Sequence, residues 1–153
     1  MPANTSPIFS LTPNVGSVMI TTTYAQTKSD GASAGSGVDF VVKCFTAGAN
    51  GSYVDRVQFF SVASAAATTG VATTLRAYLS TVAAPGATTN ANTFLLGEVS
   101  APAVVSSHST NATNYYEIIL GFSIQTGTYI HVSQHVAQTT NQAWLAKVIG
   151  GDY

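Results

Sequence analysis

Hydrophobic and polar residues alternate through most of the chain with a period of two. Leu75, Ala77 and Leu79, for example, alternate with Arg76 and Tyr78. A period of two places successive side chains on opposite faces of a β-strand, whereas a helix would repeat every 3.6 residues. The pattern predicts about eight strands, over residues 18–24, 38–44, 53–62, 73–80, 94–99, 115–122, 128–136 and 143–149.

Turn-forming residues separate these segments. Asn50-Gly51 is typical of a tight hairpin turn, and residues 84–86 and 125–127 each carry a glycine or proline. Helical propensity is confined to residues 63–67 and ends at Thr68-Thr69-Gly70. We therefore expect an all-β protein, a single antiparallel β-sandwich that is jelly-roll-like.

The N-terminal sixteen residues lack this alternation and contain three prolines. Proline removes a backbone donor and disfavours helix in the residue before it, so we expect an extended arm. We divide the chain into an arm, 1–16, and a sandwich domain, 17–153. The arm packs either on its own domain or on a neighbouring subunit, and the C-terminal tyrosine either anchors to a neighbour or frays. The residues predicted to contact neighbours are Pro7, Ile8, Phe9, Leu11, Pro13 and Tyr153.

Charge is scarce. Of 153 residues, 5 are Lys or Arg and 6 are Asp or Glu, which is 7%, while 46% are hydrophobic and the net charge is −1. An ordinary soluble domain carries roughly 25% charged residues. The composition argues against a nucleic-acid-binding surface and against disorder, and the longest apolar runs are too short for a membrane helix. A net charge near zero favours association, so we expect the protein to work inside an assembly.

Few residues offer catalytic or metal chemistry. Residues 31–35 match the G-x-S-x-G pattern of hydrolases, but that motif needs a strand before the serine, and here the strand is expected after it. His131 and His135 share a strand face at a separation of about 13 Å, too far apart for one metal ion. Cys44 lies on an apolar strand face, where an inert buried thiol is expected. We predict no enzyme, and no catalytic, cofactor-binding or metal-binding residue.

Three segments, residues 4–16, 45–57 and 150–153, together resemble a group of short virion structural proteins of tailed bacteriophages. The resemblance implies a capsid decoration or cement protein on the outer capsid surface of the virion, made in the cytoplasm of the bacterial host. It implies the major capsid protein as partner and a homo-oligomer, with a trimer favoured. This chain departs from the group at Tyr53, where a basic residue is expected.

Two other virion roles stay open from the sequence. One is a tail or neck component, and the other is a receptor- or glycan-binding component. For the latter, exposed aromatic side chains would form the sugar platform, although at strand spacing such residues more often pair across strands or fill the core. The aromatic residues concerned are Tyr53, Tyr78, Tyr115, Tyr116, Tyr129 and Trp144.

Overall fold

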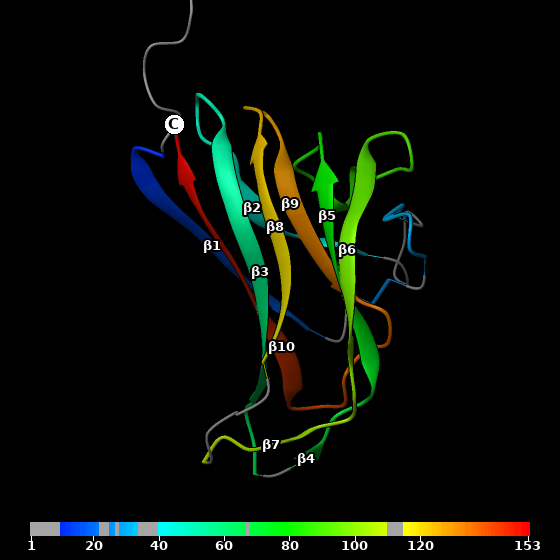
Figure 1. The fold of residues 1–153 in the computed structure, drawn as a ribbon. Coiled ribbons are helices and arrows are strands. Elements are labelled where there is room, and N and C mark those ends of the chain that lie inside the picture. The colour runs from blue at the N-terminus through cyan, green and yellow to red at the C-terminus, as the bar shows by residue number, and fades with distance from the viewer. Residues whose placement is uncertain (1–9, 22–24, 27, 34–39, 67, 110–114) are drawn as a thin grey trace, which may run out of the picture.

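The computed structural model describes residues 10–21, 25–26, 28–33, 40–66, 68–109 and 115–153. Within these residues there is no α-helix, and two antiparallel four-stranded sheets pack face to face (Figure 1). The expected all-β class and antiparallel β-sandwich are therefore confirmed. The strands are β1 (Thr12–Ile20), β2 (Val42–Thr46), β3 (Ser52–Ala63), β4 (Thr68–Thr69), β5 (Thr73–Ser80), β6 (Thr93–Ala101), β7 (Val105–Ser106), β8 (Tyr115–Ile124), β9 (Tyr129–Gln134) and β10 (Gln142–Asp152), with one 3-10 turn, Pro85–Ala87.

The strands pair in a nested order. The first sheet has the order β1-β10-β3-β8 and the second has the order β2-β9-β5-β6, while β4 and β7 form a separate two-stranded ribbon. In each sheet an early strand lies beside a late one, so β1 pairs with β10 and β2 with β9. Contacts that close the sandwich are therefore mostly between residues far apart in the sequence.

No helix of the described residues is long and apolar enough to cross a membrane.

The core lies between the two sheets. Trp144, Phe59, Phe45 and Leu75 are almost fully buried there, and the Trp144 ring meets Tyr116 edge-on at 5.6 Å. Burying one such side chain contributes roughly 1.5–3 kcal/mol. These side chains alternate with outward-facing ones along each strand, as the period of two requires.

Two glycines let the sheets approach each other at their margins. A Cβ on Gly16 of β1 would lie only 1.9 Å from the carbonyl oxygen of Cys44 in β2. A Cβ on Gly97 of β6 would lie 2.7 Å from Cγ2 of Ile118 in β8. Because both positions exclude any side chain, β1 closes against β2 and β6 closes against β8.

Several boundaries differ from those expected. β1 begins at Thr12 rather than at Val18, because β10 runs on to Asp152 and supplies it with a partner. The last residues of the predicted arm are thus part of the first sheet. The predicted strand segments 22–24 and 38–39 lie outside the described residues.

Two local predictions were wrong. Asn50-Gly51 does not close a hairpin, since β2 and β3 belong to different sheets, although Gly51 has the positive φ of 92° that favours glycine. A bulge in β3 between Val54 and Arg56 breaks the alternation, so Val54 and Val57 both face the core. A bulge adds one unpaired residue and reverses the facing of every residue after it.

Candidate functional site: the outer faces of the two sheets

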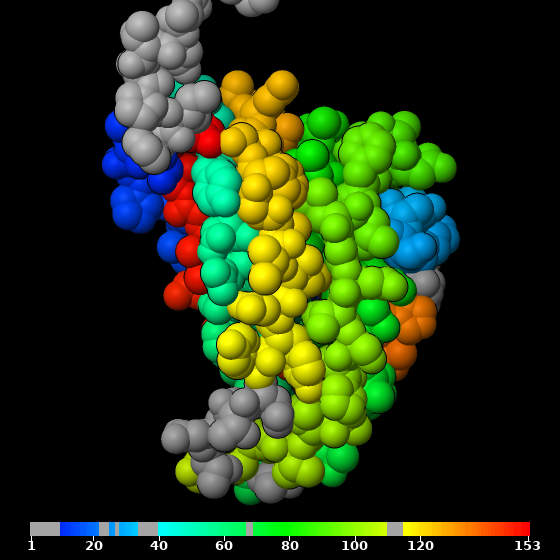
Figure 2. Space-filling view, in the orientation of Figure 1, coloured from blue at the N-terminus to red at the C-terminus, as the bar shows by residue number. Residues whose placement is uncertain are grey.

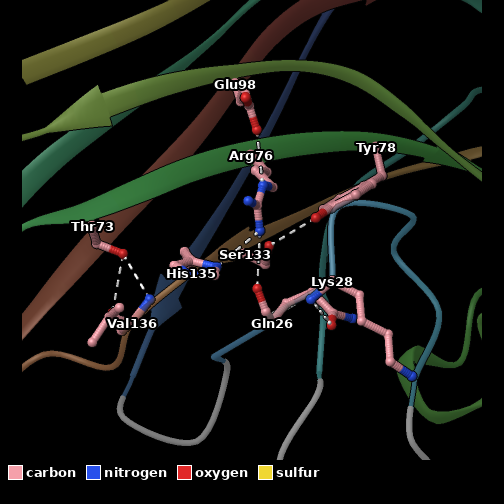
Figure 3. Close-up of polar contacts among 9 residues, drawn as sticks. All are labelled: Gln26, Lys28, Thr73, Arg76, Tyr78, Glu98, Ser133, His135 and Val136. Carbon is pink, nitrogen blue, oxygen red and sulfur yellow. Dashed lines mark hydrogen bonds and ion pairs between the residues drawn. The ribbon is translucent and has the colours of Figure 1, made fainter.

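The outer face of the second sheet is polar and yet buried. Arg76 and Tyr78 of β5 and His131 and Ser133 of β9 project away from the core, and each of them is less than a tenth exposed. A covering segment, residues 25–26 and 28–33, lies over this face (Figure 3). These side chains are therefore enclosed by the protein's own chain.

Arg76 ties the sheet to the covering segment. The register places Arg76 beside Glu98 of β6 on one side and Ser133 of β9 on the other. Its Nε donates to Glu98 Oε2 at 3.0 Å, and its Nη1 donates to the carbonyl oxygen of Gln26 at 3.0 Å and to Nδ1 of His135 at 3.4 Å (Figure 3). Arg76 is only 8% exposed, and its guanidinium is thereby paired and hydrogen-bonded, as a buried charge must be.

The covering segment is held by further contacts. The backbone N–H of Gln26 donates to Gln134 O at 2.8 Å, and its side-chain Nε2 donates to Ala32 O at 3.1 Å. Gly31, at φ 73°, lies against Tyr78 so closely that a Cβ there would be 2.9 Å from the ring. Burial raises the pKa of Tyr78, whose hydroxyl accepts from Ser133 Oγ. The polar groups of this face hold structure in place and leave little room for a substrate.

The G-x-S-x-G pattern has no catalytic geometry in its described part. Gly31 to Ser33 belong to the covering segment, and the residues from 28 to 33 form no strand, so the strand that a nucleophile elbow needs before its serine is missing. The Ser33 backbone N–H donates to Thr88 O at 3.0 Å. Residues 34–35 lie outside the described residues.

His131 and Cys44 are both buried inside the protein, where neither has the surroundings of a catalytic group. His131 is fully buried and donates from Nε2 to Val82 O at 3.0 Å, and burial lowers its pKa. Burial raises the pKa of Cys44 to about 12, so its thiol is protonated at neutral pH. No group of three or more His, Cys, Asp or Glu side chains suited to a metal ion occurs in the part of the chain that the structure describes.

The outer face of the first sheet carries two rows rich in apolar side chains, and a polar row of Ser17, Lys147, Gln58 and Glu117 lies between them. One cross-strand row joins Met19, Leu145, Phe60 and Tyr115, and a second joins Val15, Ile149, Arg56 and Ile119. Ile119 is 70% exposed and Tyr115 is 53% exposed, and the Phe60 and Tyr115 rings stack at 5.8 Å. Figure 2 views this sheet from outside, with β8 in yellow beside β3. We call the following residues the apolar face: Val15, Met19, Phe60, Tyr115, Ile119, Leu145 and Ile149.

Three charged residues on this face, Arg56, Asp55 and Glu117, pair with one another, while Lys147 lies in the polar row. Arg56 Nε lies 2.7 Å from Asp55 Oδ2, and its Nη1 lies 3.1 Å from Glu117 Oε2. Because these groups neutralise one another, little net charge opposes the approach of an apolar partner surface.

A groove opens at one end of the apolar face. Its volume is about 400 Å³, and apolar side chains of Met19, Val62 and Ala143 contribute to it from β1, β3 and β10. The remaining lining residues are Thr21, Ala63, Ser64, Thr140, Asn141 and Gln142. A smaller cleft of about 250 Å³ lies beside His135 at the edge of β5 and β6. The groove combines apolar and polar groups, as peptide-binding and ligand-binding sites do.

The structure places the predicted interface residues in different surroundings. Pro7, Ile8 and Phe9 lie outside the described residues. Leu11 is 81% exposed, and Pro13 is exposed on β1. Tyr153 contacts its own domain: its N–H donates to Gly51 O at 3.2 Å, its own carbonyl oxygen accepts from Asn50 Nδ2, and its hydroxyl meets Ser123 Oγ.

The C-terminal end is anchored by Asp152 as well. Its carboxylate accepts from Ser52 Oγ and from Asn14 Nδ2, and these hydrogen bonds lower its pKa. The tail therefore packs against its own sandwich through both of its last residues.

Comparisons of the chain with protein-family models, with curated proteins and with solved structures find no match. Of the apolar face, sequence reasoning had singled out Tyr115 alone, as one of the aromatic residues of the glycan-binding alternative. A signal for it exists in the run Ile118-Ile119-Leu120, where apolar residues occupy both faces of one strand.

Proposed function

We propose that the protein is a non-enzymatic structural protein of a phage virion, a decoration or cement protein that binds the outer capsid surface. The observation that carries this proposal is the apolar face of the first sheet. Large apolar side chains that stay exposed together on one face of a protein mark interaction sites. Exposed Ile119 in one row and the stacked Phe60 and Tyr115 rings in the other row offer apolar contacts to another protein on either side of the polar row.

The low charge of the chain supports the same proposal. Only 7% of residues are charged, so a partner surface can cover this protein without removing many ions from water. Interface centres are depleted in charged residues for this reason. The scarcity of titratable groups also leaves few side chains from which to build a catalytic site.

The strand order supports a jelly roll. Counting the eight long strands of the two sheets in chain order, the pairs are first with last, second with seventh, third with sixth, and fourth with fifth. This is the pairing of a long hairpin rolled into two sheets, an architecture found among viral capsid and lectin domains. Because one fold hosts many functions, the fold adds to the case for a virion protein but does not carry it.

Binding by many copies would stabilise the shell by mass action. A protein that binds the expanded shell and not the unexpanded one shifts the equilibrium toward the expanded state, by about 2.7 kcal/mol per site at a free concentration one hundred times Kd. Summed over a shell, this stabilisation opposes the internal pressure of packaged DNA.

Co-sedimentation tests the proposal. Purified protein is mixed with empty expanded capsids of the phage whose genome carries the gene, and with unexpanded capsids as control. We expect saturable binding to expanded capsids alone, and a rise in the temperature at which those capsids break. Binding to neither form of the shell would contradict the decoration role.

A further inference from the structure

The groove and the start of β1 lie at opposite ends of the first sheet. Thr12 pairs with Asp152 at one end, and Ile20 pairs with Trp144 at the other, where Met19 and Ala143 line the groove. Figure 1 shows the beginning of β1 in blue beside the C-terminal end of β10 in red, far from the beginning of β10. The arm thus leaves the sandwich at the end that lacks the groove.

The arm's apolar residues cannot reach the groove of their own copy. The strand rises about 3.3 Å per residue, so Met19 lies roughly 23 Å along β1 from Thr12. A chain spans at most about 3.6 Å per residue, which limits Ile8 to roughly 14 Å and Phe9 to roughly 11 Å from Thr12. If these side chains occupy such a groove, it belongs to another copy.

The groove suits such a segment chemically. Met19, Val62 and Ala143 offer apolar surface for Ile8 and Phe9. Ser64 Oγ donates to Asn141 Oδ1 at 3.3 Å, which leaves the Asn141 amide N–H groups to bond the carbonyl groups of an extended backbone. Pro7 lacks an N–H, so one fewer donor of the arm needs a partner. Leu11, 81% exposed, continues the apolar character of the arm up to β1.

We propose that residues 7–11 of one copy bind in the groove of a second copy of this chain. The contact joins different surfaces of the two copies, so it is head-to-tail, and such contacts close into rings or continue as filaments. A closed ring of three copies agrees with the trimer that the resemblance favours. The inference deepens the proposed function by giving the arm a partner, but it requires no capsid.

Two complementary variants test this contact. Deletion of residues 2–9 removes the arm and keeps the groove, whereas Ala143→Arg fills the groove and keeps the arm. Met19→Arg is a second groove variant, on a different strand, in case Ala143→Arg fails to fold. Ala91→Arg adds the same charge at an exposed turn away from the groove and serves as the control.

Sedimentation gives a distinct result for each sample. The unmodified protein and Ala91→Arg should form an oligomer, while the arm deletion and the groove variants should each be monomers of about one chain mass with unchanged circular dichroism. An equimolar mixture of the arm deletion with Ala143→Arg should stop at a one-to-one dimer, since only one intact arm and one intact groove are present. Monomers in that mixture, or an oligomer formed by either variant alone, would overturn the inference.

The outcome is separable from the capsid test. A one-to-one dimer without capsid binding by the unmodified protein would support the arm contact and contradict the decoration role. The opposite result is capsid binding by the unmodified protein together with arm and groove variants that keep the full oligomeric mass. That result would support the decoration role and contradict the arm contact.

Discussion

The two outer faces of the sandwich contrast in an unusual way. The second sheet turns Arg76, Tyr78 and His131 outward, and this polar face is buried under the protein's own covering segment. The first sheet turns Phe60 and Ile119 outward, and this apolar face is largely open. In a free soluble monomer the exposed face would be the more polar one and the buried face the more apolar one, which is the reverse of the arrangement found here.

The contrast shows which outer face the protein covers with a segment of its own chain. On the polar face, hydrogen bonds that Arg76 and Gln26 donate hold the covering segment in place. Burial there still leaves His131 Nδ1 without a hydrogen-bond partner among the described residues, and such an unsatisfied group costs about 1–3 kcal/mol. The apolar face needs only a dry partner surface, which another molecule can supply. The following predictions test this division, beginning with the largest expected effect.

Arg76→Met should destabilise the fold by about 2–3 kcal/mol. Removing one partner of a buried ion pair costs more than that, about 3–5 kcal/mol, but Glu98 is half exposed and regains water. The free energy of unfolding in urea measures the loss. The matched substitution Arg56→Met on the first sheet, where the ion pairs are at the surface, should cost much less. Equal losses would remove the distinction between the two faces.

Gly31→Ala should destabilise by about 2 kcal/mol, because a left-handed φ costs about 1 kcal/mol and the Cβ would also press on the Tyr78 ring. Gly127→Ala is the matched control, with φ 75° and no atom within 4 Å of the added Cβ. Thermal unfolding of both variants is compared, and the difference between their losses of stability measures the cost of the contact between the new Cβ and the Tyr78 ring. A loss as large for Gly127→Ala would mean that the covering segment is not packed tightly on Tyr78.

His131 should make stability depend on pH. Burial lowers its pKa in the folded state below the ordinary 6.5, so below pH 6.5 the unfolded chain binds a proton that the folded chain does not. Stability then falls as the pH drops, by up to about 1.4 kcal/mol per pH unit, until the folded-state pKa is reached.

His131→Gln keeps a donor for Val82 O and removes the titration. Urea unfolding between pH 7.5 and 5 should show a smaller decline for this variant than for the unmodified protein. Parallel declines would show that His131 is not responsible for the pH dependence.

Ile119→Lys should change the free energy of unfolding by less than about 0.5 kcal/mol, since the side chain is 70% exposed in the single chain. The same variant is expected to weaken binding to the capsid, because it places a charge among the exposed apolar residues of the edge strand β8. Chemical unfolding of dilute monomer measures the first effect. A loss of stability in the monomer would mean that Ile119 supports the fold itself.

Strand positions were predictable because alternation is local. Leu75 and Ala77 were expected on one face and Arg76 and Tyr78 on the other, and β5 has this arrangement. Strand pairing was not predictable, since contacts such as Asn14 to Asp152 join residues 138 positions apart. The burial of Arg76 depends on Gln26, which no spacing rule connects to β5.

The candidate surface was partly visible in the sequence. Ile118, Ile119 and Leu120 give β8 apolar residues on both of its faces, a sign that both are covered in use. Its extent was hidden, because Tyr115, Phe60 and Leu145 meet only through the register of three strands. The bulge in β3 also determines which of its residues face outward.

The central claim is that the apolar face of the first sheet binds the capsid. Co-sedimentation with expanded empty capsids tests it most directly when Ile119→Lys is compared with Ser100→Lys, which adds the same charge at an exposed position of β6 in the second sheet. We predict at least tenfold weaker binding for Ile119→Lys and unchanged binding for Ser100→Lys. Unchanged binding of Ile119→Lys would contradict the account.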